Sequence, residues 1–188
     1  ACANAASDTL TVIEARTDTV AETIWAKPSP ADLFGAQPNA LAFDPSGRTL
    51  YVANGTQNAV AVIRFAPRNA KSSLAGLIPA GWFPGALAVH PKLRLLCVAN
   101  IKGLETRPGV ERRTGGEGFN THQYRGSLSL VPLPKASELP AMTRTVWKNF
   151  HRERIAGALL PPRPLRLPFG TCRRPGRRAL PSRSGLPG

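Results

Sequence analysis

The sequence predicts an all-β protein: a partial β-propeller of about two to three blades of four-stranded antiparallel sheet, followed by a C-terminal helix and a disordered tail. Three observations predict it. A blade-length repeat occupies the first two thirds of the chain, turn signals separate its short apolar segments, and the composition combines 42% hydrophobic residues with 19 Pro and 17 Gly. A period of ~40–50 residues with several short strands is typical of propeller blades.

The repeat aligns residues 38–54 with residues 84–100 without a gap, at an offset of 46 residues. Both copies begin Pro-x-Ala-Leu-Ala and end Val-Ala-Asn, and a second apolar strand follows each, at 60–63 and, after an insertion, at 128–131. Residues 1–13 repeat this ending. We therefore expect a repeat region over 1–135, with blade cores near 38–63 and 84–131 and a partial blade at 1–13, so that the chain opens in mid-blade.

Each copy reads as a hairpin with buried strands. Asp44-Pro45-Ser46-Gly47 places Pro second and Gly fourth, as a type I turn favours. The segments Leu50–Ala53 and Leu95–Val98 are apolar at almost every position, which indicates strands that are buried on both faces.

The core Tyr51-Val52-Ala53-Asn54 resembles the YVTN-type β-propeller repeats, a WD40-like kind of repeat, over roughly residues 1 to 135. Cys97 replaces the Tyr in the second copy, and the first copy is truncated. Propellers need typically four to eight blades, so the resemblance implies that this chain is a fragment.

The insertion at 101–128 resembles a segment of the large bacterial proteins that join such a propeller to a C-terminal alkaline-phosphatase-like phosphoesterase domain. Residues 139–160 and the following Pro161-Pro162-Arg163-Pro164 are similar to the exit from that propeller. The resemblance implies a divalent metal in the phosphoesterase domain. The metal-binding and nucleophile motifs of that domain have no counterpart here, so no catalytic residue is carried over.

The formal net charge of +14 is unevenly distributed. Residues 151–188 hold 9 Arg and one acid, Glu153. We do not expect nucleic-acid binding despite the charge, because the Arg clusters lack interleaved aromatic residues. No apolar run reaches membrane-spanning length, and we expect no signal peptide within the given residues. The parent protein is expected to be periplasmic or secreted.

The end of the chain divides in two. Leu139, Met142, Val146, Phe150 and Leu159 lie at roughly helical spacing, which predicts one helix within the exit segment 136–160, packed on the propeller rim. Residues 161–188 form a Pro/Arg-rich tail that we expect to be disordered. Three interpretations compete for it: a nucleic-acid arm, an ordinary linker and, favoured, sequence read out of frame from GC-rich DNA.

The recurring Asn4, Asn54 and Asn100 have two interpretations. They cap strand ends, or they form a ring of polar side chains around a ligand channel. Together with His122 in the insertion 101–124, Asn54 and Asn100 are the candidate ligand-facing residues. His90 and His151 are expected in a turn and on a helix face. Cys2, Cys97 and Cys172 match neither a disulfide framework nor a zinc site.

These observations favour a non-catalytic binding or scaffold fragment that meets a ligand or protein partner at the propeller face, with no catalytic, cofactor or metal residue of its own. The alternative is a hydrolase, either a metal-dependent phosphoesterase through the missing domain or a lactonase-like propeller. Two and a half blades leave apolar faces exposed, so the isolated chain is expected to aggregate or associate.

Overall fold

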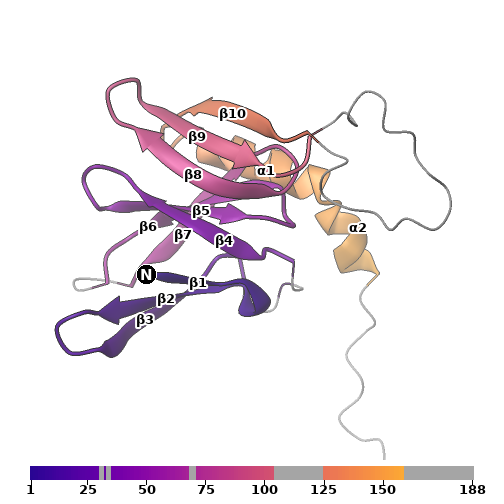
Figure 1. Cartoon of the computed structure of the whole chain (residues 1–188). Coiled ribbons are helices and arrows are strands. Elements are labelled where there is room, and N and C mark those ends of the chain that lie inside the picture. The colour runs from indigo at the N-terminus through magenta and orange to yellow at the C-terminus, as the bar shows by residue number, and fades with distance from the viewer. Residues whose placement is uncertain (30–31, 33–34, 68–70, 104–124, 159–188) are drawn as a thin grey trace, which may run out of the picture.

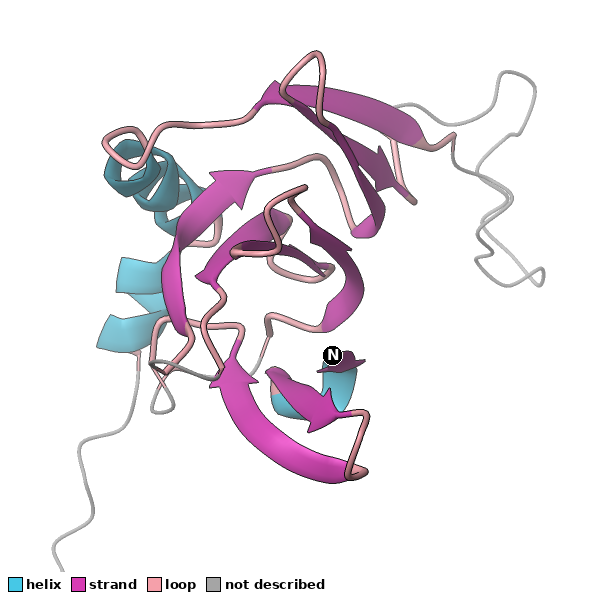
Figure 2. Ribbon diagram, turned by 90° about the vertical axis from the view of Figure 1, so that its left-hand side faces the viewer, coloured by secondary structure: helices cyan, strands magenta, loops and turns pink. Residues whose placement is uncertain are grey.

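The computed structural model describes residues 1–29, 32, 35–67, 71–103 and 125–158, and its core is three antiparallel sheets stacked face to face (Figure 1). The predicted tail at 161–188, with Cys172, lies outside the described residues. The all-β prediction is confirmed. Figure 2 shows the sheets from the side, with the two C-terminal helical segments along one flank of the stack.

The first sheet has the order β1-β2-β3, the central sheet β4-β5-β6-β7 and the third sheet β10-β9-β8. The strands are β1 Cys2–Asn4, β2 Thr9–Glu14, β3 Thr19–Trp25, β4 Pro38–Phe43, β5 Thr49–Asn54, β6 Ala59–Arg64, β7 Ser73–Pro79, β8 Pro84–His90, β9 Leu95–Asn100 and β10 Ser127–Pro132, with a short 3-10 turn η1 at Ala5–Ser7.

The expected four strands are present in the central sheet, whereas each of the other two contains three among the described residues. After β10 the chain enters a helix that packs against β7 and adds no fourth strand to the third sheet. In the first sheet β1 is the counterpart of β5, since both end in the repeated Asn, and no described strand corresponds to β4.

The repeat extends to details of strand pairing. The register shifts between Pro38 and Ala40 in the central sheet and between Pro84 and Ala86 in the third, at equivalent positions. A second shift recurs between Val12 and Ile13 and between Val62 and Ile63. Such bulges increase local twist, so equivalent sheets acquire similar curvature and can stack in the same way.

The hairpin turn of the central sheet is confirmed. The Gly47 N–H donates to the Asp44 carbonyl at 3.0 Å, and Gly47 has φ +68°, which glycine adopts without a Cβ penalty. The Asp44 carboxylate accepts from the backbone N–H of Thr49 at 2.8 Å and from the Ser46 hydroxyl at 2.6 Å.

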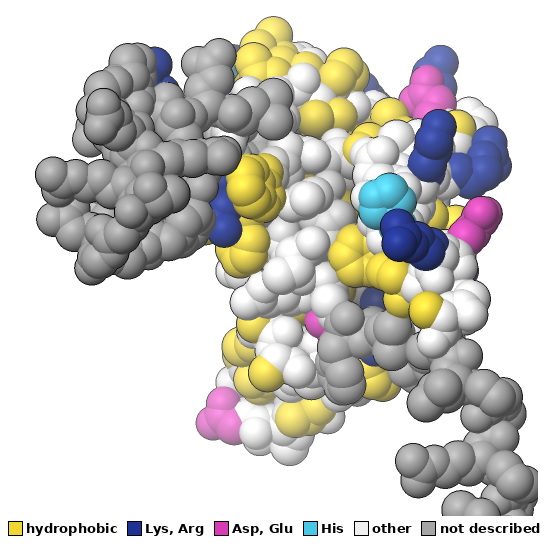
Figure 3. Space-filling view, turned by 90° about the vertical axis from the view of Figure 1, so that its right-hand side faces the viewer, with side chains coloured by type: hydrophobic (Ala, Val, Ile, Leu, Met, Phe, Trp, Pro, Cys, Tyr) yellow, Lys and Arg dark blue, Asp and Glu magenta, His cyan; other side chains and the backbone are white. Residues whose placement is uncertain are grey.

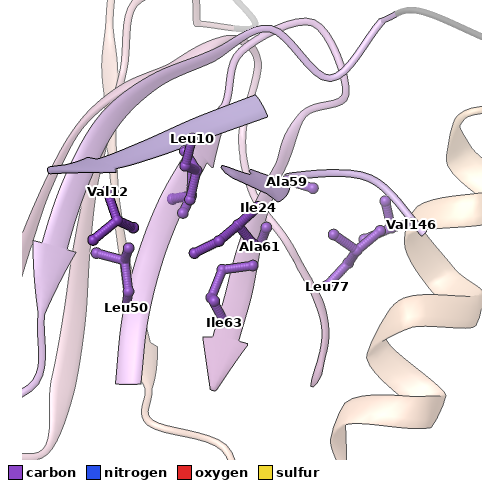
Figure 4. Packing of buried hydrophobic residues seen from close by; sticks show 10 residues of the cluster. Leu10, Val12, Ile24, Leu50, Ala59, Ala61, Ile63, Leu77 and Val146 are labelled. Atoms are coloured by element: carbon purple, nitrogen blue, oxygen red, sulfur yellow. The ribbon is translucent and has the colours of Figure 1, made fainter. Parts of the chain in front are cut away.

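Two apolar clusters join the sheets. The first lies between the first and central sheets (Figure 4), where side chains from β2 and β3 point toward those from β5 and β6. The second lies between the central and third sheets. The main side chains of the first are Leu10, Val12, Ile24, Leu50, Val52, Ala61 and Ile63, and those of the second are Tyr51, Val60, Val62, Ile78, Leu96 and Val98.

Burial on both faces is confirmed for Leu50–Ala53, all of which are buried. It is wrong for Leu95–Val98, where Leu96 and Val98 are buried but Leu95 and Cys97 are partly exposed. The cause is the number of neighbours, because the third sheet contacts the central sheet on one face only.

The C-terminal helix is present but broken. Helix α1 spans Leu139–Asn149 and α2 spans Arg152–Gly157, so the prediction of one continuous helix is wrong. His151, between them, has the left-handed φ of 52°. The break lets Arg152 stack on Trp147, 5.0 Å from its ring centroid, and form an ion pair with Asp32 at 2.7 Å.

Helix α1 covers the outer edge of the central sheet. Leu139 and Val146 are buried against the two clusters, and the Thr143 hydroxyl accepts from the Leu77 N–H of β7 at 2.9 Å. An edge strand with unpaired backbone groups is a site for unwanted strand pairing, which α1 prevents here. None of the described helices has the length and apolar character needed to span a bilayer.

Candidate functional site

The repeated asparagines are the last residues of equivalent strands, and their amide groups form hydrogen bonds to neighbouring residues there. Asn4 Nδ2 donates to the hydroxyls of Thr9 and Thr11, at 3.1 and 2.8 Å. Asn100 Nδ2 makes the same pair of bonds in the third sheet, to Ser127 Oγ at 3.2 Å and Ser129 Oγ at 2.9 Å. In both sheets the Asn ties its strand to the next strand.

Asn54 differs because Ala59 and Ala61 stand where the other two sheets have hydroxyls. Its Nδ2 donates instead to the Ala26 carbonyl, at the end of the first sheet, and to Gln57 Oε1, both at 2.9 Å. The repeated Asn therefore joins neighbouring strands in the first and third sheets, whereas in the central sheet it joins that sheet to the first.

The candidate residues Asn54 and Asn100 are 0% and 3% exposed, and their carboxamide oxygens have no hydrogen-bond partner among the described residues. Gly81 lies directly over Asn100, so that a Cβ there would collide with the amide. The Nδ2 groups of both asparagines bond within the fold, and their unpartnered oxygens are buried. A ligand-facing role stays a prediction, and His122 lies outside the described residues.

A second repeated interaction, which the sequence analysis missed, latches each sheet to the next. Asp8 and Asn58 occupy equivalent positions four residues after the repeated Asn, with φ of 55° and 52°. Asp8 Oδ1 accepts from the Gln37 N–H, and Asn58 Oδ1 accepts from the Phe83 N–H, both at 2.9 Å. Asp and Asn tolerate this left-handed conformation better than most residues, a signal that was present in the sequence.

The latch at Asp8 carries a buried charge pair. Its carboxylate also accepts from the Gly35 N–H at 3.1 Å and lies 3.7 Å from Lys27 Nζ. Both side chains are buried, and Lys27 Nζ donates to the Asp32 carbonyl at 2.7 Å. These bonds offset hydration that both charges lose on burial, and removal of either partner would leave the other charge buried and uncompensated.

The insertion leaves and rejoins the third sheet beside Asn100. The Ile101 N–H donates to the Phe83 carbonyl at 2.9 Å and the Lys102 N–H to the Trp82 carbonyl at 3.2 Å. Gly103 approaches the Arg125 carbonyl so closely that a Cβ would collide with it. A cavity of ≈ 460 Å³ opens here, lined by Gly81, Trp82, Lys102, Gly103, Arg125, Gly126, Ser127 and Ser129.

This cavity brings together the chemistry that recognises anions. It combines the ammonium of Lys102, the guanidinium of Arg125 and the hydroxyls of two serines, and Lys102 Nζ lies 5.1 Å from the Trp82 ring centroid. Cations with hydroxyl donors suit phosphate or carboxylate groups. Among the described residues, no three His, Cys, Asp or Glu side chains gather as metal ligands would.

The opposite ends of the sheets carry the hairpin turns. Burial raises the pKa of the Asp44 carboxyl, but hydrogen bonds from the Ser46 hydroxyl and from the N–H groups of Thr49, Ser46 and Arg48 outweigh it and hold this pKa below its usual value. Burial raises the pKa of the Tyr51 phenol, and the Asp44 carboxylate raises it further while Arg94 opposes them.

The two described histidines lie near the expected places rather than in them. His90, the counterpart of Asp44, is the last residue of β8, and its Nδ1 accepts from the N–H of Leu93 in the following turn at 3.2 Å. His151 lies at the break between α1 and α2. Neither contacts the cavity beside the insertion.

Comparison with known proteins finds no matching family model and no matching curated protein. Among solved structures, the chain is similar to Kuenenia stuttgartiensis hydrazine synthase, with 25% identity and a TM-score of 0.44 over 53% of this chain and 25% of that one. It is also similar to a functionally unknown protein from Desulfotomaculum acetoxidans DSM 771, with 18% identity and a TM-score of 0.41 over 52% of this chain and 30% of that one. The chain thus spans less than a third of either protein.

Proposed function

We propose that this chain is a non-catalytic binding scaffold, part of a YVTN-type β-propeller within a larger phosphoesterase-type protein. One observation carries the scaffold proposal: the two sheet junctions repeat each other, in apolar packing and in the latches of Asp8 and Asn58. Repeated supersecondary units that bury their faces on their neighbours make extended platforms, and such platforms bind through their loops.

The cavity beside the insertion is the binding site that we propose on this scaffold. It lies at the strand ends, where loops of a repeat protein build a ligand surface. Lys102 and Arg125, with the two serine hydroxyls, favour an anionic group on the ligand or partner.

Hydrolysis assays test the non-catalytic part. We expect the chain to hydrolyse neither bis(p-nitrophenyl) phosphate nor a sugar lactone above the buffer rate, with or without Mn²⁺, Zn²⁺ or Ca²⁺. Metal-dependent phosphodiester turnover would favour the phosphoesterase alternative, and lactone turnover would favour the lactonase alternative.

A thermal-shift titration with inorganic phosphate tests the cavity. A ligand that binds only the folded state raises the melting temperature as its concentration increases above Kd. We expect this shift to disappear in the double variant Lys102→Ala/Arg125→Ala and to persist in Arg48→Ala/Lys92→Ala, which removes two exposed cations elsewhere. Equal shifts in both variants would show that phosphate acts away from the cavity.

A further inference from the structure

A groove follows helix α1 from the edge of the central sheet to α2. It consists of two hollows, one of ≈ 440 Å³ between β7 and α1 and one of ≈ 560 Å³ between α1 and α2. Arg144 and Trp147 of α1 line both hollows, so the two are continuous with each other. The groove shares no lining residue with the cavity beside the insertion, and it is therefore a separate candidate site.

The half of the groove between β7 and α1 is apolar. Its lining includes Pro28, Leu74, Pro140 and Trp147, and Arg144 is the only charged residue among those that line it. The prolines and the indole are rigid apolar groups, so this hollow suits an apolar side chain of a ligand.

The half of the groove between α1 and α2 is basic. The two helices contain four cationic residues, Arg144, Lys148, Arg152 and Arg154, and one acid, Glu153. All five line this hollow. Figure 3 looks at the side of the molecule on which α2 lies in Figure 1, and it shows Lys and Arg side chains gathered there.

Within the described part of the chain, carboxylates balance only one of these cations. Arg152 pairs with Asp32 at 2.7 Å, whereas none of the described carboxylates forms an ion pair with Arg144, Lys148 or Arg154. Arg144 and Lys148 are also four residues apart on α1, a spacing at which like charges destabilise a helix. An anionic ligand would relieve this repulsion, and the positive field would attract it.

Two kinds of anionic partner fit the groove poorly. A nucleic-acid base needs an aromatic face for stacking, but the Trp147 ring packs on the first apolar cluster and its centroid lies 5.0 Å from Arg152 Cζ. A membrane surface needs exposed apolar side chains, and among the described residues of α1 and α2 no large apolar side chain is strongly exposed. An acidic polypeptide has neither requirement.

We propose that this groove binds an acidic polypeptide segment in which carboxylates lie next to an apolar side chain. The carboxylates pair with Arg144, Lys148 and Arg154, and the apolar side chain occupies the hollow beside Trp147. Hydrogen bonds between ionised groups are stronger than those between neutral groups, so the cations supply most of the attraction. Because these cations are exposed, binding weakens as the salt concentration increases.

Fluorescence polarisation with labelled peptides tests this proposal on the full chain. We expect the peptide EELEELEE to bind and the peptide QQLQQLQQ, which has no charge, not to bind. The peptide EESEESEE, which has no apolar side chain, should bind more weakly than EELEELEE. Arg144→Glu/Lys148→Glu should raise the Kd for EELEELEE by about tenfold or more, because two attractions become two repulsions.

Arg48→Glu/Lys92→Glu is the matched control, since it changes the net charge equally at exposed positions outside the groove, and it should bind EELEELEE nearly as the wild type does. Equal weakening in both variants would contradict a local site, and equal binding of EELEELEE and QQLQQLQQ would contradict recognition of carboxylates. Tighter binding of oligo(dT) or of phosphatidylserine vesicles, lost in Arg144→Glu/Lys148→Glu, would overturn the assignment to a polypeptide. The phosphate-dependent thermal shift of the cavity beside the insertion should persist in that variant, so the two proposed sites can fail separately.

Discussion

The central and third sheets contain copies of one repeat, yet they differ in burial. Strands β5 and β6 are covered on both sides, whereas β9 and β10 are covered on one side only. The two lead-in strands β4 and β8 even share their bulge position. Similar apolar strands thus become buried or exposed according to whether another sheet lies against them.

The sheets also differ at their ends. The central sheet ends in the latch residue Asn58 and sends the Asn54 amide to the neighbouring sheet, whereas the third has Gly126 and keeps the Asn100 amide within itself. The insertion lies at the end of the third sheet, where none of the described residues forms such a latch. The repeat therefore joins neighbouring sheets in the central copy and only neighbouring strands in the described part of the third.

The largest effect should come from the latched junction. Asp8→Ala leaves Lys27 buried without its carboxylate and two backbone N–H groups without an acceptor, so we expect a loss of about 3–5 kcal/mol in the free energy of unfolding. Asp18→Ala is the matched control, because Asp18 has the same left-handed backbone, φ 52°, in an exposed turn. Urea denaturation of both variants measures the difference, and equal losses would mean that the latch contributes nothing.

Truncation of apolar side chains should show that the central sheet contributes more to stability than the third. Leu50→Ala removes a side chain that is fully buried between the first and central sheets, and we expect it to cost about 2–5 kcal/mol. Leu128→Ala removes a side chain of β10 that is 64% exposed, and it should change the stability of the monomer by no more than about 0.5 kcal/mol. Denaturation at low protein concentration compares them. A large loss for Leu128→Ala would show that its face is already covered in the monomer.

A smaller loss should follow removal of the Asn100 amide. Asn100→Ala leaves the Ser127 and Ser129 hydroxyls without their donor, and we expect a loss of about 1–3 kcal/mol. Hydrogen exchange should increase in β9 and β10 and not in β5 and β6. Asn149→Ala, at an exposed helix end, serves as the control. Exchange that rises equally in the central sheet would contradict a bond confined to the third sheet.

The smallest effect concerns the turn at Asp44. Because its pKa in the folded state is lower than the ordinary value of 3.8, the stability that its ionised form contributes is fully present above that value. This stability is lost as the pH falls through the folded-state pKa. The urea midpoint of the wild type should therefore fall more steeply than that of Asp44→Asn when the pH decreases below 3.8. Parallel curves would show that the hydrogen bonds do not favour the ionised form.

Much of the fold could be predicted from local patterns. The repeat located the strand segments around 50–54 and 60–63, Pro45 and Gly47 marked the hairpin turn, and the apolar spacing from Leu139 to Val146 marked α1. The break at His151 could not be predicted, because it depends on contacts of Arg152 with Asp32, 120 residues away in the chain. The sequence could have marked Asp8 and Asn58 as candidates for left-handed backbone, but it could not identify their partners, the backbone N–H groups of Gln37 and Phe83, which have no sequence signature.

The sequence by itself determined the unit of this protein: a repeated set of short apolar strands whose periodicity and turn residues act over a few positions. Only the tertiary structure decided which copies of that unit are covered, because burial depends on the neighbour that a face meets. It also decided that Asn54 joins two sheets while Asn100 joins two strands, since the bonds of each amide depend on whether hydroxyls or alanines stand opposite it.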